Sequence, residues 1–332
     1  MGIRQRFEQQ LEELRTDVLK MGSMVEQFYG DGAGCLVIGK DNVIAEFKGA
    51  HSVSCDFIPS YRGANATFDY GWEERWIREE GFSKIIPAAI SGLLEKCGLS
   101  MDDIAKVVYP CHLSSSVHKS IAKPLKAAPQ KIQGNLAEVV GDTGAAHPLV
   151  MFVSALEEAS PGDKIVVASF GQGCDALLFD VTDNIKKLPA RSGVKGSLAN
   201  RKEETQYSRF QKFRDVVNVE MGIRAEANKQ TALSALWRYR KQVLGLVGGE
   251  CTKCGTPQYP KMRMCVNPSC NAVDTQVEHE FADKTGSIKS YTGDMLAVSV
   301  DPPAIYGLVQ FEGGGRALYD FTDCELADVK VG

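Results

Sequence analysis

Four cysteines near the C-terminus constrain the fold of this chain more than any other feature. They form the pairs Cys251-Thr-Lys-Cys254 and Cys265-Val-Asn-Pro-Ser-Cys270, with ten residues between the pairs. Each pair sits on a tight turn that directs two sulfurs toward one centre, which suits the tetrahedral geometry of Zn²⁺. Because all four ligands would be thiolates, the metal would be structural rather than catalytic. Buried or disulfide-bonded cysteines are the alternative, but the paired spacing favours a zinc ribbon.

Length and composition indicate a cytoplasmic globular protein with two or more domains. The chain has 332 residues, is 44% hydrophobic and carries a net charge of −4, so it can bury substantial cores. No apolar run reaches membrane-spanning length, and residues 1–27 lack the apolar core of a signal peptide. The other six cysteines are scattered, as expected of reduced thiols. A pI near 5.8 argues against nucleic-acid binding.

Hydrophobic patterns divide the chain into five segments. An amphipathic helix is predicted for residues 1–27, and alternating strands and helices predict an α/β domain over 28–182. A basic helical linker covers 183–243 and the zinc ribbon covers 244–280. Short strands over 281–332 suggest a complete or incomplete OB-fold. Between Lys186 and Lys241 the linker has fourteen Lys/Arg against five Asp/Glu. A solvated surface is the default interpretation of this charge, and contact with an acidic partner or an anionic ligand is the alternative.

Individual elements follow from the spacing of apolar residues and from turn residues. Within 28–182, strands are expected at Cys35–Ile38, Ile104–Tyr109, Lys164–Phe170 and Ala176–Val181, and helices at 84–98, 114–128 and 145–159. After the ribbon, strands are expected near Gly286–Thr292, Met295–Val300, Ile305–Phe311 and Ala317–Phe321.

Several motifs resemble known families. GDGAG at 30–34, GDTGAAHPL at 141–149 and GQG at 171–173 resemble the C-terminal half of the thiolase superfamily, especially 3-hydroxy-3-methylglutaryl-CoA synthase-like and ketoacyl synthase III-like enzymes. CTKCG, YPKMRMCVNPSC, DPPAIYG and FEGGGR resemble the zinc ribbon plus OB-fold module of the DUF35 family. The first helix resembles the beginning of PhoU, a helical-bundle regulator, over one helix only, so no phosphate function is assigned to it.

The resemblance implies an acyltransferase that forms or cleaves carbon–carbon bonds with a CoA thioester or an acyl carrier as substrate. In that superfamily the nucleophilic cysteine lies in the first half, which this sequence does not match, so the chain alone is expected to be inactive. Cys35 and Cys55 do not replace it, because neither opens a helix after a buried strand. The family usually has Asn where this chain has Asp142, which points to altered chemistry such as retro-aldol cleavage.

Candidate catalytic groups cluster after predicted strands. By resemblance His112 lies near the superfamily's catalytic histidine, which polarises a thioester carbonyl or moves protons; an incidental surface histidine is the alternative. Asp142 can act as acid or base, or cap the following helix. Gly171 and Gly173 suit an oxyanion or acyl-positioning loop, or simply a tight turn. His147 is either a supporting residue or a helix-start residue, and Cys111 and His118 are weaker candidates.

A half-domain of this kind is expected to need a partner. The helices at 84–98 and 145–159 would otherwise leave apolar faces open to water. A self-dimer or a separate, cysteine-bearing thiolase-like subunit would cover them, and the second arrangement also restores the nucleophile. The other possibility is a noncatalytic protein in which the ribbon and OB-fold organise a partner enzyme or bind acyl-CoA.

Overall fold

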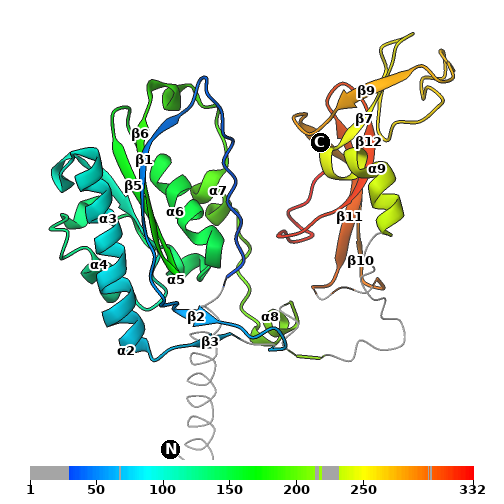
Figure 1. Cartoon of the computed structure of the whole chain (residues 1–332). Helices are drawn as coiled ribbons and strands as arrows, with labels where there is room; N and C mark the ends of the chain where they lie inside the picture. The colour runs from blue at the N-terminus through cyan, green and yellow to red at the C-terminus, as the bar shows by residue number, and fades with distance from the viewer. Residues whose placement is uncertain (1–29, 67–68, 214–216, 219–231, 298, 300) are drawn as a thin grey trace, which may run out of the picture. The chain divides into compact units, whose positions relative to one another are not determined.

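The computed structural model describes residues 30–66, 69–213, 217–218, 232–297, 299 and 301–332. The chain separates into two compact units, one ending at Ala199 and the other beginning at Asn200 (Figure 1). The helix predicted for residues 1–27 lies outside the described residues. No helix in the described ranges combines the length and apolar character needed to cross a membrane.

Unit 1 is built around one mixed sheet. Its order is β1-β6-β5-β4; β5 and β4 are parallel and the other two pairs are antiparallel. A separate short hairpin joins β2 and β3. The elements in chain order are β1 (Ala45–Val53), β2 (Ser60–Tyr61), β3 (Tyr70–Gly71), α2 (Glu74–Trp76), the π-helical η1 (Ile77–Phe82), α3 (Ser83–Cys97), η2 (Met101–Asp103), β4 (Lys106–Val108), α4 (Ser115–Ile121), η3 (Pro129–Lys131), α5 (Ala137–Val140), η4 (Gly144–Ala146), α6 (His147–Leu156), β5 (Lys164–Gly171), β6 (Gly173–Val181), η5 (Asp183–Lys187) and α7 (Gly193–Ala199).

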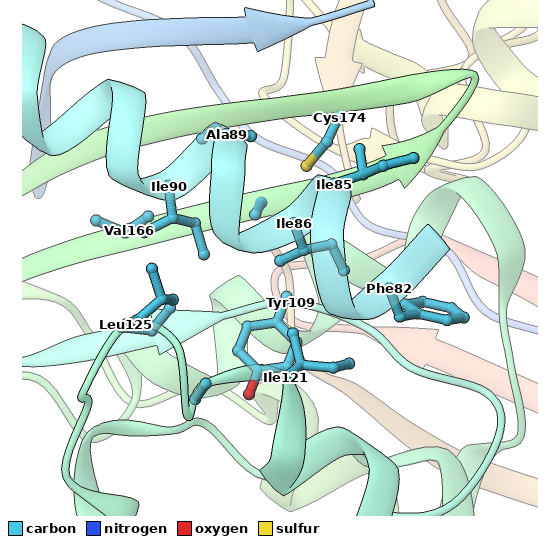
Figure 2. Close-up of a cluster of buried hydrophobic side chains, with 14 of the residues drawn as sticks. Phe82, Ile85, Ile86, Ala89, Ile90, Tyr109, Ile121, Leu125, Val166 and Cys174 are labelled. Carbon is cyan, nitrogen blue, oxygen red and sulfur yellow. The ribbon is translucent and has the colours of Figure 1, made fainter. Parts of the chain in front are cut away.

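Helices α3 and α4 contribute to the main core on one face of this sheet (Figure 1). The apolar residues of α3 recur three or four positions apart and therefore form one buried stripe. Figure 2 shows Ile86 and Ile90 of this stripe close to Val166 of β5 and Tyr109. The helix ends where Gly98 adopts a left-handed conformation with φ of 65°, a conformation that glycine adopts without steric cost.

Helix α6 covers the opposite face. Side chains of β5 alternate between the two faces, with Val166 and Ala168 in the first core and Ile165 and Val167 in the second. Met151 of α6 belongs to this second core, together with Phe152 and Ala155. A strand buried on both faces reads as a continuous apolar run, which explains why β5 was predictable from sequence.

The apolar faces of α3 and α6 are therefore already covered within unit 1. Ile86, Ile90, Leu93, Met151 and Ala155 all have side chains fully removed from solvent. The expectation that these two helices leave apolar faces open to water is wrong, because each packs on one face of the four-stranded sheet. A partner for this unit stays a prediction. Exposed aromatic residues of this unit lie elsewhere, on β1, on the β2–β3 hairpin and around α2, and include Phe47, Tyr61, Tyr70, Trp72 and Trp76.

Most of the predicted α/β elements are confirmed. The helix predicted at 84–98 is α3, and the helix predicted at 145–159 is α6, which is shorter than predicted. The strands predicted at 104–109, 164–170 and 176–181 correspond to β4, β5 and β6. The helix predicted for 114–128 ends at Ile121 instead. Pro124 explains the early end, because proline lacks an amide donor and disfavours helical conformation in the residue before it.

The strand predicted at Cys35–Ile38 is wrong. Val37 and Ile38 are almost fully exposed and belong to no sheet. The edge position is taken by β1, which pairs with β6 and is interrupted between Phe47 and Gly49 by a shift in register. Its largely exposed side chains hide the strand from an analysis of hydrophobicity.

Unit 2 contains two three-stranded sheets. One has the order β8-β7-β9 and holds the four paired cysteines, and the other is the antiparallel sheet β10-β11-β12. The strand predicted at 295–300 is not found at Met295–Ala297, which form a bend, while 298 and 300 lie outside the described residues. An OB-fold over 281–332 stays a prediction. The elements are α8 (Tyr207–Phe213), α9 (Leu233–Gly245), β7 (Val247–Cys251), β8 (Pro257–Gln258), β9 (Gln276–Glu280), β10 (Gly286–Asp294), β11 (Ala304–Phe311) and β12 (Arg316–Asp320).

The turn between β5 and β6 yields a stability prediction. Gly173 has a φ of +94°, and a Cβ added there would lie 2.0 Å from the Val53 carbonyl oxygen. We expect Gly173→Ala to lower the free energy of unfolding by about 1–3 kcal/mol, because strain and a backbone clash both oppose the side chain. Gly171→Ala is the matched control, since a Cβ there meets nothing within 4 Å. Urea unfolding of both variants tests this, and equal losses would contradict it.

Candidate functional site

His112 lies in the loop that connects β4 to α4. Its side chain is 11% exposed, and its ring meets the ring of Phe82 edge-on with centroids 5.2 Å apart. The following helix starts where the Ser114 hydroxyl accepts a hydrogen bond from the Val117 amide, an arrangement typical of helix N-termini. The loop therefore presents His112 beside an aromatic wall of the main core.

Asp142 lies opposite His112. Its Oδ2 atom is 3.6 Å from His112 Nδ1, an ion-pair distance, and its side chain is 19% exposed. Its Oδ1 atom accepts a hydrogen bond of 2.8 Å from the Gly144 amide at the start of η4. The two sequence interpretations of Asp142 are therefore compatible, because one oxygen supports the helix start while the other faces the histidine.

Electrostatics favour a neutral His112. Burial lowers its pKa, and the charges of Asp142 and Glu74 counteract this only in part. A neutral imidazole is the form that can accept a proton. Burial also raises the pKa of the neighbouring Cys111 thiol to about 11, which is opposite to the shift that activates a nucleophilic cysteine.

The glycine-rich segment at 30–34 packs against the loop that carries Asp142. The Gly30 amide donates a hydrogen bond of 2.9 Å to the Asp142 carbonyl. A Cβ at Gly30 would overlap the Val140 carbonyl, and one at Gly32 would lie 2.6 Å from the Thr143 side chain. Glycine is needed here for close approach of two backbones. Two motifs that are far apart in the sequence thus meet at one site.

Gly171 and Gly173 face each other at the tip of the β5–β6 hairpin. The preceding Phe170 meets Phe82 edge-on with ring centroids 5.1 Å apart, and Phe82 in turn contacts His112. Phe57 stacks on Phe170 at 6.4 Å. The hairpin tip is thus linked to His112 by a row of aromatic rings. The role of the two glycines as oxyanion or acyl-positioning residues stays a prediction.

The two other histidines of this region, His118 and His147, are buried and make hydrogen bonds with the backbone. His118 Nε2 lies 3.0 Å from the Tyr109 carbonyl oxygen, and burial lowers the pKa of His118 to about 4. His147 begins α6 and contacts the Asn135 carbonyl and the Thr143 amide. Neither the aromatic wall nor Asn135 was identified from the sequence, because single Phe and Asn residues carry no distinctive spacing.

The four paired cysteines converge in unit 2. Their four Sγ atoms all lie within 4.8 Å of one another. The Sγ–Sγ distance is 3.9 Å for Cys251–Cys270 and 3.5 Å for Cys254–Cys265. Four Zn–S bonds of about 2.3 Å in a tetrahedron place sulfurs roughly 3.8 Å apart, so these cysteines could hold such a metal. A hydrogen bond with the Thr275 hydroxyl is the main cause that lowers the pKa of Cys251 to about 6. The thiols are free, so the disulfide alternative is not observed.

Comparison with known proteins finds sequences related to this chain. Residues 94–178, which include His112 and Asp142, match the family model of the 3-oxoacyl-[acyl-carrier-protein (ACP)] synthase III C-terminal domain. The chain is similar to hydroxymethylglutaryl-CoA synthase of Caldivirga maquilingensis, at 26% identity over 201 residues, or 60% of this chain and 57% of that protein. The Methanopyrus kandleri synthase is 29% identical over 171 residues, or 50% and 48%.

The chain spans about half the length of the curated relatives it matches. Among solved structures, the 3-oxoacyl-[acyl-carrier-protein] synthase III of Aquifex aeolicus is 16% identical with a TM-score of 0.37, covering 42% of this chain and 46% of that one. The predicted sequence resemblance to hydroxymethylglutaryl-CoA synthase and to the ketoacyl synthase III C-terminal domain is confirmed. The resemblances to DUF35 and PhoU stay predictions.

The proximity of Asp142 to His112 generates a test by titration. We expect Asp142→Asn to lower the pKa of His112 further, because the variant removes a negative charge that favours the imidazolium. NMR titration of ¹⁵N-histidine-labelled protein measures this directly. Asp175→Asn is the matched control, because this carboxylate in β6 accepts a hydrogen bond from the Ser52 hydroxyl, and it should leave the pKa of His112 unchanged. An unchanged or raised pKa for His112 in Asp142→Asn would show that the two side chains do not interact.

Proposed function

We propose that unit 1 handles an acyl thioester, with CoA or an acyl carrier as the thiol, in the manner of the hydroxymethylglutaryl-CoA synthase and ketoacyl synthase III groups. One observation carries this proposal. His112 and Asp142 lie 3.6 Å apart within the segment that matches the synthase family model. A buried histidine facing a carboxylate is a common arrangement for proton transfer.

We assign separate roles to the two imidazole nitrogens. Nδ1 faces Asp142, so in the proposed step Nδ1 carries the proton on the side of the carboxylate and Nε2 acts as the base toward the substrate. In the proposed step, Nε2 removes a proton from the α-carbon of the thioester or from a β-hydroxyl group. In the first case the electron pair of the C–H bond forms an enolate. In the second case the alkoxide oxygen forms a carbonyl as the Cα–Cβ bond breaks, and the electron pair of that bond forms the enolate of the departing thioester. In both cases Asp142 stabilises the resulting imidazolium.

A carboxylate at position 142 favours this acid–base role over binding of a thioester oxygen. An ionised Asp cannot donate a hydrogen bond to that oxygen, whereas the Asn usual in the family can. Retro-aldol cleavage therefore fits the site at least as well as condensation. Phe82 beside His112, together with Phe170 packed against Phe82, offers an apolar wall for the acyl group. A nucleophilic cysteine would come from a thiolase-like subunit or from another part of the assembly.

For unit 2 we propose a structural Zn²⁺ held by Cys251, Cys254, Cys265 and Cys270. The four-thiolate donor set and the spacing of the sulfurs support this assignment. The metal would fix the two cysteine turns beside β7 and β9 and would leave no position for substrate. We also propose that residues 281–332 complete a DUF35-type OB-fold module.

A second candidate is a noncatalytic role, in which the ribbon module organises an acyl-CoA-processing partner and the chain only binds acyl-CoA. The closed four-cysteine cluster favours this role, because a metal saturated by protein ligands takes no part in chemistry. The two candidates differ in whether His112 moves protons.

Exchange of α-protons separates them. Incubation with acetyl-CoA or acetoacetyl-CoA in D₂O should incorporate deuterium, measured by mass spectrometry, if His112 acts as a base. We expect His112→Gln to slow this exchange at least ~10²-fold, a typical contribution of a general base. His279→Gln is the matched control, since His279 pairs with Glu250 in the ribbon. If acyl-CoA binds but does not exchange in the wild-type chain, the noncatalytic role holds.

Zinc binding has its own test. Reduced, purified protein should contain one Zn²⁺, measured by elemental analysis, for the one four-cysteine cluster found among the residues that the structure describes. Cys251→Ala should lose the metal and destabilise the ribbon, because binding free energy of a structural site is folding free energy. Cys324→Ala is the control, as this free thiol lies in unit 2 but outside the cluster. Zinc-free wild-type protein would refute the assignment.

A further inference from the structure

Asn135 holds the backbone of the residue that precedes His112. The Cys111 amide donates a hydrogen bond of 2.9 Å to Asn135 Oδ1, and Asn135 Nδ2 donates one of 2.5 Å to the Cys111 carbonyl. One side-chain amide thus satisfies both the donor and the acceptor of Cys111. The arrangement fixes the orientation of this peptide segment and hence the position of the next side chain.

His147 connects the same residue to the loop that carries Asp142. Its Nε2 donates to the Asn135 carbonyl at 2.7 Å, and its Nδ1 accepts a bond of 3.2 Å from the amide of Thr143, the residue after Asp142. The side chain is only 1% exposed. Because Thr143 N–H can only donate, Nδ1 must be the acceptor, and His147 must be the neutral tautomer with its proton on Nε2.

We propose that Asn135 and His147 are positioning residues that set the separation between His112 and Asp142. The two loops come from different parts of the chain, one after β4 and the other after α5. The described hydrogen bonds form a continuous route from Cys111 through Asn135 and His147 to Thr143. Neither residue would touch the substrate; each acts through the backbone beside a reacting side chain. The inference deepens the proposed function, but its test does not require turnover.

The backbone next to Asn135 supports this assignment. Leu136 has a φ of +61°, a left-handed conformation that is costly for a branched side chain. Such a conformation persists when neighbouring contacts determine it. The contacts present are the two bonds from Asn135 to Cys111 and the bond from His147 to the Asn135 carbonyl. His118 differs, since it bonds the Tyr109 carbonyl and makes no described contact with the Asp142 loop.

A double-mutant cycle on the titration of His112 tests the proposal. In the wild-type chain, Asp142→Asn should lower the pKa of His112. In the backgrounds Asn135→Ala and His147→Leu the same substitution should shift the pKa much less, because His112 no longer faces position 142. The charge of Glu74 also raises the pKa of His112, but Glu74 is present in every variant, so its effect cancels when the pKa shifts are compared. His118→Gln removes another buried histidine and should leave the full shift.

Thermal unfolding of each variant checks that the fold is retained. An undiminished shift in folded Asn135→Ala or His147→Leu would overturn the proposal, as would an equal loss of the shift in His118→Gln. If these variants do not fold, the same pKa shift measured in Asn135→Ser and the ¹⁵N spectrum of the wild-type chain still test the proposal. The wild-type His147 must appear as the neutral Nε2–H tautomer, and any other form would refute the bridge. Intact coupling without deuterium exchange would refute the proposed reaction and leave the positioning role standing.

Discussion

The parallel pairing of β4 with β5, covered on both faces, is the constraint on which unit 1 depends. Because Val107 and Val108 point to opposite cores, β4 is held by α3 on one side and α6 on the other. A parallel strand so enclosed has no freedom to slide, since a shift by one residue would exchange its two apolar faces. The chain that leaves β4 at Tyr109 is therefore fixed, and His112 follows three residues later. Open α/β sheets commonly place their sites at such strand ends.

The same constraint explains which parts of the structure could be predicted from the sequence. Strand β5 and helix α3 are recognisable because burial demands apolar residues at fixed periods. Strand β1 is not recognisable from hydrophobicity because it is an edge strand whose side chains are exposed or half-buried, with a shift in register at Gly49. The run Cys35–Ile38 was misread for the opposite reason. It is apolar, but the glycine segment before it is used to approach the Asp142 loop rather than to start a strand.

The candidate site was only partly predictable. His112, Asp142 and the four cysteines carry signals in their spacing or in their resemblance to known motifs. Their partners do not. Asn135 reaches Cys111 across twenty-four residues of sequence, and Phe170 reaches Phe82 from another strand. Such contacts arise from tertiary packing, which hydrophobic periodicity does not encode beyond the choice of face. The cysteines are the exception, because the turn geometry of each pair is local and the geometry required by a metal is general.

The carboxylate at position 142 gives the site its chemical character. An amide there would present a donor to a substrate oxygen, whereas a carboxylate presents negative charge to His112. Burial opposes protonation of that histidine, and the carboxylate favours it. The balance lowers the pKa of His112, and in the proposed function the Asp142 carboxylate stabilises the imidazolium once a proton arrives. A site with these two opposing influences is suited to accepting a proton during reaction rather than to carrying one beforehand. In the proposed reaction the separation of the two side chains therefore matters more than the charge of either alone, and that separation is what the Asn135 and His147 hydrogen bonds set.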